Sequence, residues 1–168
     1  MTNKEISDIL NNITIIIDTR ENKYQHITKY LDEIKISYEF EKLKSGDYTF
    51  ILPNYPELNV NRKFLVERKA NLSELAGNFT TGRDRFQREF ERLDDDEKIH
   101  IVLESSSWKK LYNGTYRSKL NPRSFVASLL TWSIRYNIPV WMVETSESPE
   151  LIYRILYYEL YEFLKTQK

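Results

Sequence analysis

Three short segments of the chain carry carboxylates and a lysine in an arrangement that suits the chemistry of phosphate esters. One apolar run ends at Asp18, Asp47 follows a glycine, and Glu67 and Lys69 stand two residues apart. Alternate side chains of a strand share a face, so Glu67 and Lys69 are expected on one side of a sheet and Arg68 on the other. If the strand after Asp47 pairs with this one, two carboxylates and an ammonium meet on one face.

This combination favours magnesium chemistry. Mg²⁺ is typically held by one or two carboxylates, waters and a substrate phosphate. A lysine beside it orients or deprotonates the attacking water, while the metal stabilises charge on the phosphate oxygens. A Glu-x-Lys triplet is nevertheless common in charged proteins, and a cross-strand ion pair explains it equally well.

Asp18 and Glu21 extend the pattern. Asp18 closes the first buried strand, where a carboxylate lies beside the crevice at the end of a sheet. Both acids also fit the start of a helix, Asp18 as a cap and Glu21 in the first turn. Spacing alone leaves the two interpretations open.

The elements that must position these residues follow from hydrophobic periodicity. Short β-branched or aromatic runs predict strands at 13–17, 38–43, 48–52, 64–69, 99–103 and 140–143. Apolar residues at helical spacing predict helices at about 24–34, 72–79, 83–93, 125–136 and 151–164. The alternation predicts an α/β fold with a mixed central sheet flanked by helices on both faces. The 168 residues suit a single domain, 1–168, with its core at about 13–165.

Composition narrows the function further. The chain has no Cys and only two His, which excludes thiolate-held zinc and argues against an imidazole-rich metal site. The N-terminal residues lack the pattern of a signal peptide, and no apolar stretch is long enough to span a bilayer. We therefore expect an intracellular, cytoplasmic protein without a membrane partner.

Charge is segregated although the net charge is zero. No acidic residue occurs between Glu104 and Glu144, whereas that segment contains Lys109, Lys110, Arg117, Lys119, Arg123 and Arg135. A phosphate backbone responds to the local field, so the segment is a candidate DNA-binding region. A solvated loop with chance clustering of charge is the alternative.

The motifs together resemble the nuclease domain of the XPF family, a group with a restriction-endonuclease-like fold. The three segments read Ile16-Ile17-Asp18-Thr19-Arg20-Glu21, Gly46-Asp47-Tyr48 and Val66-Glu67-Arg68-Lys69, in the order and approximate spacing of the family pattern. Asn121-Pro122 before a helix and Ile138-Pro139-Val140 before a strand are also similar to it. The resemblance covers residues 13–165.

The resemblance implies roles for individual residues. Asp47 and Glu67 would bind Mg²⁺ or Mn²⁺, with Asp18 in the metal or water network, and Lys69 would be the catalytic lysine. Arg20, Glu21 and Arg68 would support the site or face phosphate. Arg68 alternatively pairs with a buried carboxylate on the other face of the sheet.

The segment 73–86 is similar to stand-alone family members of phages and mobile elements. It would direct Arg83 and Arg85 to DNA, although Arg85 and Glu89 also form an ordinary helix ion pair. Family members have an aspartate at the position of Ser73 or one residue on, at Glu74. Glu74 is expected to substitute for it, or the position is structural. The chain shows no helix-hairpin-helix units, which leaves its DNA geometry open.

The last predicted helix carries two apolar stripes, one of them rich in tyrosine. Two stripes indicate burial on both sides, and the resemblance implies pairing of nuclease domains through this region. We expect a homodimer, with a helix wedged inside its own fold as the alternative.

The predicted function is a metal-dependent DNA endonuclease that hydrolyses phosphodiester bonds at branched or single-strand-containing DNA in repair, recombination or replication. The alternatives are a non-catalytic DNA-binding module of the same fold, or a purely structural phage or host-takeover protein. Degenerate, non-catalytic relatives lack some of the acidic or lysine positions, and all are present here, which favours the enzyme.

Overall fold

The contacts of the chain divide it into two compact units. The computed structural model describes residues 1–167. Unit 1 comprises Met1–Val66 and the segment that begins at Pro149, and unit 2 comprises Glu67–Ser148. The division falls inside strand β4 (Phe64–Lys69), so the first half of β4 belongs to unit 1 and the second half to unit 2.

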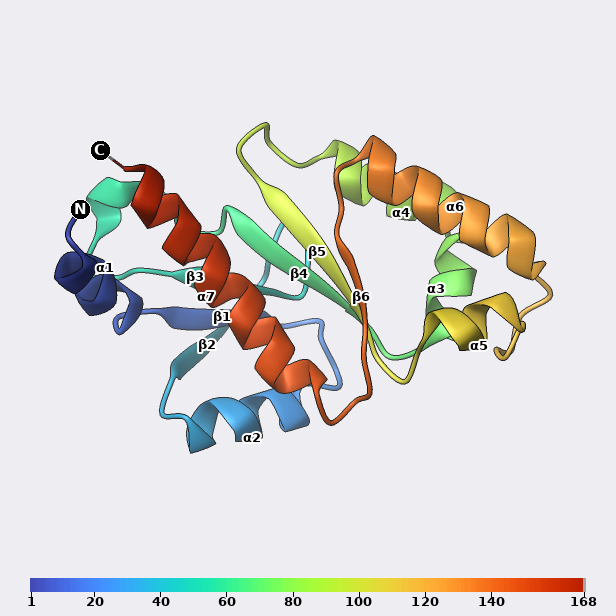
Figure 1. Ribbon diagram of the computed structural model, residues 1–168, viewed down its shortest axis with the longest axis horizontal. Coiled ribbons are helices and arrows are strands. Elements are labelled where there is room, and N and C mark those ends of the chain that lie inside the picture. The colour runs from blue at the N-terminus through green and yellow to red at the C-terminus, as the bar shows by residue number, and fades with distance from the viewer. Residues whose placement is uncertain (168) are drawn as a thin grey trace. The chain divides into compact units, whose positions relative to one another are not determined.

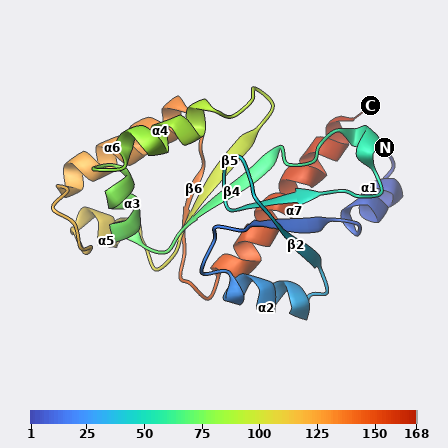
Figure 2. The same ribbon diagram turned by 180° about the vertical axis from the view of Figure 1, so that it is seen from behind.

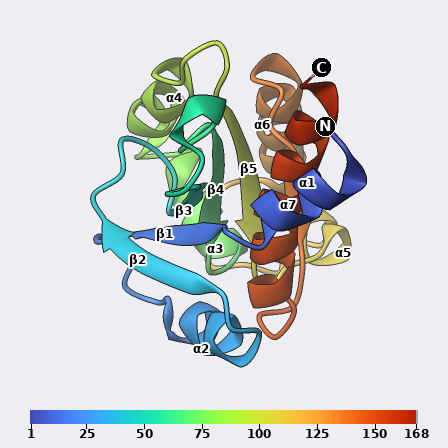
Figure 3. The ribbon, with the colours of Figure 1, turned by 90° about the vertical axis from the view of Figure 1, so that its left-hand side faces the viewer.

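The strands of unit 1 follow the order β2-β1-β3-β4. The first three are β1 (Thr14–Asp18), β2 (Ser37–Glu41) and β3 (Tyr48–Ile51). β1 pairs with β2 in parallel, as Figure 3 shows, and with β3 antiparallel, while β3 pairs antiparallel with β4. Every residue of β1 is buried, which explains its continuous apolar run.

Three helices and a short 3₁₀ turn complete unit 1. They are α1 (Asn3–Leu10), α2 (Gln25–Glu33), η1 (Pro56–Leu58) and α7 (Ser148–Thr166). α7 crosses the strands β1 and β3 along one face (Figures 1 and 2) and buries Ile152, Leu156 and Leu160. α1 opens with a reciprocal cap in which Thr2 accepts from Glu5 N and Glu5 accepts from Thr2 N.

The strands of unit 2 follow the order β4-β5-β6, with β5 and β6 parallel. Its elements are α3 (Leu72–Asn78), α4 (Arg83–Glu91), β5 (Lys98–Leu103), α5 (Trp108–Tyr112), α6 (Pro122–Arg135) and β6 (Val140–Met142). An aromatic cluster joins α4 to α6, with Trp132 contacting the rings of Phe79, Phe86 and Phe90. Such packing contributes beyond the area it buries.

The predicted strands and helices are confirmed, with boundaries displaced by a few residues. The sequence did not reveal α1, η1 or α5. No helix within residues 1–167 is long and apolar enough to span a bilayer.

A left-handed glycine sets the entrance to β3. Gly46 has φ +72°, and a Cβ at this position would lie 3.2 Å from Leu65 Cβ and 3.3 Å from the Val66 carbonyl oxygen. Both the backbone angle and the close approach of β4 therefore require glycine. This turn presents Asp47, whose N–H donates to Val66 O at 2.8 Å.

We predict that Gly46→Ala destabilises the protein by about 1–3 kcal/mol, because the new methyl group adds a contact with β4 to the cost of a left-handed angle. Urea unfolding measures the change. Gly77→Ala is the matched control: Gly77 lies in α3, and nothing lies within 4 Å of the place that its methyl group would take, so alanine there should stabilise by about 0.5–1 kcal/mol. Equal effects of both substitutions would contradict the role of Gly46.

Candidate active site

Backbone hydrogen bonds bring the first two predicted motifs to β4. Asp18 N donates to Asp47 O at 2.8 Å, and Asp47 N donates to Val66 O at 2.8 Å. Val66 immediately precedes Glu67 in the chain. The main chain at Asp47 is thus held on both sides, at the ends of β1 and β3, and its side chain is half-buried.

The carboxylate of Asp18 is already saturated. It is 1% exposed. Oδ1 accepts from the N–H and Nε of Arg20, and Oδ2 accepts from Arg20 Nη2 and Leu43 N, all at 2.7–2.8 Å. Burial pushes its pKa up, but the hydrogen bonds and the charge of Arg20 outweigh burial, so the pKa of Asp18 lies below its usual value.

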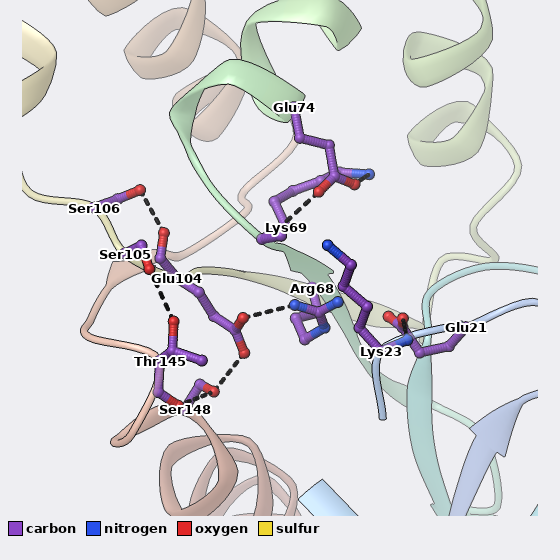
Figure 4. A network of polar contacts seen from close by, with 11 residues as sticks. Glu21, Lys23, Arg68, Lys69, Glu74, Glu104, Ser105, Ser106, Thr145 and Ser148 are labelled. Carbon is purple, nitrogen blue, oxygen red and sulfur yellow. Dashed lines mark hydrogen bonds and ion pairs between the residues drawn. The ribbon is translucent and has the colours of Figure 1, made fainter. Parts of the chain in front are cut away.

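Arg20 and Glu21 are thereby engaged in local structure. Arg20 also donates to Leu43 O, although its side chain is 60% exposed. Glu21 N donates to Asp18 O, and Glu21 Oε1 accepts from Lys23 N at 2.7 Å, a contact drawn in Figure 4. The turn after β1 is therefore braced by the same residues that the sequence suggested for the site.

Glu67 and Lys69 form a buried pair in unit 2. Lys69 Nζ donates to Glu67 Oε1 at 2.6 Å, and each side chain is 10% exposed. Glu74 Oε1 lies 3.9 Å from the same ammonium (Figure 4), while Glu74 Oε2 accepts from Ala70 N. Glu74, beside Ser73, thus places a carboxylate next to Lys69.

Glu89 on α4 is a member of this cluster that sequence reasoning missed. Burial first, and then the negative charge of Glu67, raise the pKa of Glu89 above its usual value. Lys69, Arg85 and Arg92 act in the opposite direction without cancelling the effect. Only its helical spacing from Arg85 was visible in the sequence.

Arg68 adopts the other pairing that the sequence left open. Arg68 Nη1 donates to Glu104 Oε2 at 2.7 Å, with the two side chains 4% and 3% exposed. Ser148 Oγ donates to Glu104 Oε1 at 2.5 Å, so both carboxylate oxygens have donors (Figure 4). Arg68 therefore forms a buried ion pair, and its partner Glu104 is a residue that no motif singled out.

The predicted DNA-facing residues fall into two groups. Arg83 lies with its guanidinium carbon 4.9 Å from the centre of the Trp132 ring and donates weakly to Ser128 Oγ at 3.5 Å, whereas Arg85 is exposed. The basic residues between 109 and 123 lie on α5, the following loop and the start of α6, and Lys110 alone among them has a side-chain partner in residues 1–167.

The donor set suits a hard cation. Within residues 1–167, no three His, Asp or Glu side chains are gathered as a ready-made metal site, and Mg²⁺ needs only one or two carboxylates with water completing its shell. Burial, and then the negative charge of Glu67, raise the pKa of Glu89, so carboxylates act on one another in this cluster. A divalent cation would reduce their mutual repulsion.

Comparison with known proteins identifies the family of the chain. The sequence profile of the ERCC4 domain matches residues 17–155. The chain belongs to the ERCC4-domain family. The matched region contains Asp18, Asp47, Glu67 and Lys69, and the family is one of DNA nucleases.

Solved structures share the fold of this ERCC4 domain. Two structures of XPF from Aeropyrum pernix, one of them in complex with DNA, match with TM-scores of 0.64 and 0.62. Each is 20% identical and covers 87% of this chain. The match spans 64% of the Aeropyrum chains. No curated protein matches the sequence significantly. The predicted restriction-endonuclease-like α/β fold, with its mixed sheet, is confirmed.

We predict that Asp18 stabilises the fold. Its pKa lies below the ordinary value of 3.8, so its contribution is present above that pH and is lost as pH falls through the folded-state pKa. Asp18→Asn should lower the free energy of unfolding by about 2–3 kcal/mol at pH 7, with a smaller difference in acid. Denaturant unfolding at both pH values measures this.

Asp32→Asn on the exposed end of α2 is the control and should change stability by less than about 0.5 kcal/mol. An Asp18→Asn variant as stable as the wild type would contradict the structural role and return Asp18 to the metal network.

Proposed function

We propose that this ERCC4 domain is a metal-dependent DNA endonuclease that hydrolyses phosphodiester bonds. The observation that carries the proposal is the buried Glu67–Lys69 pair, which follows directly on the residue that accepts the backbone hydrogen bond of Asp47. Two acids and a lysine are thereby delivered by adjoining stretches of main chain, and Asp47 is presented by a glycine turn that fixes its backbone.

We assign the metal ligands to Asp47 and Glu67, with Mg²⁺ or Mn²⁺ as the ion. When bound, the ion would supply positive charge to the phosphate oxygens and help to acidify a water. Asp18 is proposed as the residue that holds the end of β1 against Asp47, because its oxygens already accept four hydrogen bonds. Glu89 has a raised pKa because of burial and then the charge of Glu67, and a cation at Glu67 would reduce that repulsion.

Lys69 is proposed as the catalytic lysine. Its ammonium donates to Glu67 and lies within 3.9 Å of Glu74, so two carboxylates orient it. An ammonium held in this way can donate a hydrogen bond to a water or to a phosphate oxygen at the reacting centre. Burial to 10% exposure limits its alternative partners and keeps the contact in a low-dielectric environment.

The substrate is proposed to be branched or single-strand-containing DNA, in repair, recombination or replication. The Aeropyrum XPF structure in complex with DNA supports DNA as the ligand of this fold. The exposed cations of unit 2, together with the absence of acids between residues 105 and 143, support a surface for phosphates.

Cleavage assays test the nuclease directly. Fork, flap, duplex and single-stranded DNA are incubated with Mg²⁺, with Mn²⁺ or with a chelator. We expect metal-dependent cleavage, and Asp47→Ala and Lys69→Ala should each lower the rate at least about 100-fold. Lys29→Ala and Asp32→Ala, on the exposed surface of α2, are matched controls that should cut normally. Unchanged cleavage in both site variants would contradict the assignment of the site. No cleavage of any substrate, together with intact DNA binding, would favour a non-catalytic module.

We also propose that the protein forms a homodimer through the region of α7. Tyr158 is 53% exposed there, and its ring contacts Tyr157 and Tyr161. Aromatic surface of this kind is favoured at interfaces because it combines apolar area with a polar tip.

Sedimentation equilibrium at micromolar concentration should give the mass of a dimer, and Tyr158→Ala should shift the population towards monomer. A monomer at these concentrations would instead indicate that α7 serves only its own fold.

A further inference from the structure

Unit 2 leaves two large aromatic side chains side by side in solvent. Trp108 and Tyr112 lie one turn apart on α5 and are 37% and 60% exposed. Their ring centres are 5.9 Å apart with an interplanar angle of 30°. The other large aromatic residues of the unit are mostly drawn into the cluster around Trp132. A paired exposed aromatic surface is a typical sign of a binding site.

A groove borders one of these rings. Tyr112, Pro122, Arg123, Val126 and Ala127 line a depression of about 350 Å³ where α5 meets the first turns of α6. Figures 1 and 2 both show α5 beside the beginning of α6. The volume lies at the lower end of the range found for small-molecule sites, which suits a single aromatic base.

The groove is built by local backbone chemistry. Gly114 has φ +69°, and a Cβ there would lie 3.1 Å from Pro122 Cγ. The chain therefore reverses closely after α5 only with glycine at this position. Asn121 caps α6 by accepting from Arg123 N at 2.9 Å, with Pro122 in the first turn. The walls of the groove are thus fixed by a turn and a cap.

The surroundings are cationic. Lys109, Lys119 and Arg123 are exposed, and their side chains have no hydrogen-bond or ion-pair partner within residues 1–167. No acidic residue occurs from 105 to 143. Lys110 is different, because it donates to Ser105 O and lies 3.8 Å from Glu144 Oε1. Lys109, Lys119 and Arg123, together with Trp108 and Tyr112, form a surface that we call the α5 platform.

We propose that the α5 platform binds an unpaired segment of single-stranded DNA. One base stacks on Tyr112 in the groove, Trp108 receives a neighbouring base, and the three cations contact the phosphates. The inference rests on the proposed DNA function and deepens it, since it gives the single-stranded part of the proposed substrate a binding site on the protein.

The aromatic residues favour a single strand over a duplex. Base faces in a duplex are covered by their neighbours, whereas an unpaired base offers a face for stacking on an aromatic ring. Cations alone would bind either form through phosphates. The positive surroundings likewise favour a nucleic acid over a second copy of this neutral chain as the occupant.

Fluorescence anisotropy with a labelled oligo-dT, in a chelator and at several salt concentrations, tests the proposal. Tyr112→Ala and Trp108→Ala should each weaken binding about 5- to 150-fold, the loss of one base stack, and Tyr112→Phe should retain it. Phe40→Ala is the matched control, an aromatic residue of β2 that is 45% exposed beside Tyr24 and Tyr38, and should bind as the wild type does.

Salt dependence separates the two kinds of contact. Lys119→Ala should reduce the slope of log K against log salt by about 0.7, since one phosphate contact is lost. Tyr112→Ala should leave the slope unchanged. The same measurements with a duplex of equal length should show an effect of Lys119→Ala and little effect of Tyr112→Ala.

The proposal is overturned if oligo-dT does not bind, if neither aromatic substitution weakens it, or if duplex binding falls as much as single-strand binding. A fall in binding that accompanies a change in sedimentation mass would identify the surface as an interface between copies and would also overturn it. Binding in chelator is independent of cleavage. If the protein binds DNA through the α5 platform but never cuts it, only the nuclease proposal is refuted. If it cuts DNA but its binding does not respond to the substitutions of Tyr112 and Trp108, only the platform proposal is refuted.

Discussion

The two backbone hydrogen bonds at Asp47 are the constraint on which the arrangement depends. They join the end of β1 to the start of β3 and the start of β3 to β4, three segments that are distant in sequence. Strand pairing has a period of two, so a slip by one residue would turn Glu67 and Lys69 away from their face and bring Arg68 to it. Gly46 helps to keep that register, because it has no Cβ and therefore allows β4 to approach closely. The position of Asp47 is therefore set by main-chain hydrogen bonds.

The second half of β4 places charges on both of its faces, at a cost in desolvation. The buried charges on the two faces have different sets of partners. Arg68 pairs with Glu104, whose other oxygen accepts from Ser148, so the charges are balanced and both carboxylate oxygens have donors. On the other face, Lys69 donates to Glu67 and lies 3.9 Å from a carboxylate oxygen of Glu74. Glu89 is a further carboxylate with a raised pKa. The Arg68 pair serves architecture, whereas the carboxylates around Lys69 lie on the face where the metal site is proposed.

The sequence predicts elements well where periodicity is strong and poorly where elements are short. The run that forms β1 and the apolar face of α7 were visible because burial is continuous or regularly spaced. α5 has five residues, too few for a periodic signal, although the capping Ser107 precedes it. α1 could have been found from its cap, since Thr2 and Glu5 have the spacing of a capping box.

Within the candidate site, the motifs named the residues but not their partners. The bonds of Asp18 to Arg20 lie within one turn, yet its fourth donor is the backbone of Leu43, which no side-chain pattern reveals. Glu89 and Glu104 likewise meet Glu67 and Arg68 only after the chain has folded back across the sheet of unit 2. Tertiary pairing of this kind decides whether a carboxylate is structural or chemical, and spacing does not encode it.

The division of the chain inside β4 has a consequence for biosynthesis. Unit 2 is inserted in sequence between the two parts of unit 1, and the helix that covers β1 and β3 follows it. A ribosome therefore releases all of unit 2 before the residues that complete unit 1 have emerged. Because domains form from the amino terminus as synthesis proceeds, β1 and β3 must wait for α7 with apolar surface uncovered. The nascent polypeptide thus completes unit 1 only after the whole of unit 2 has been synthesised.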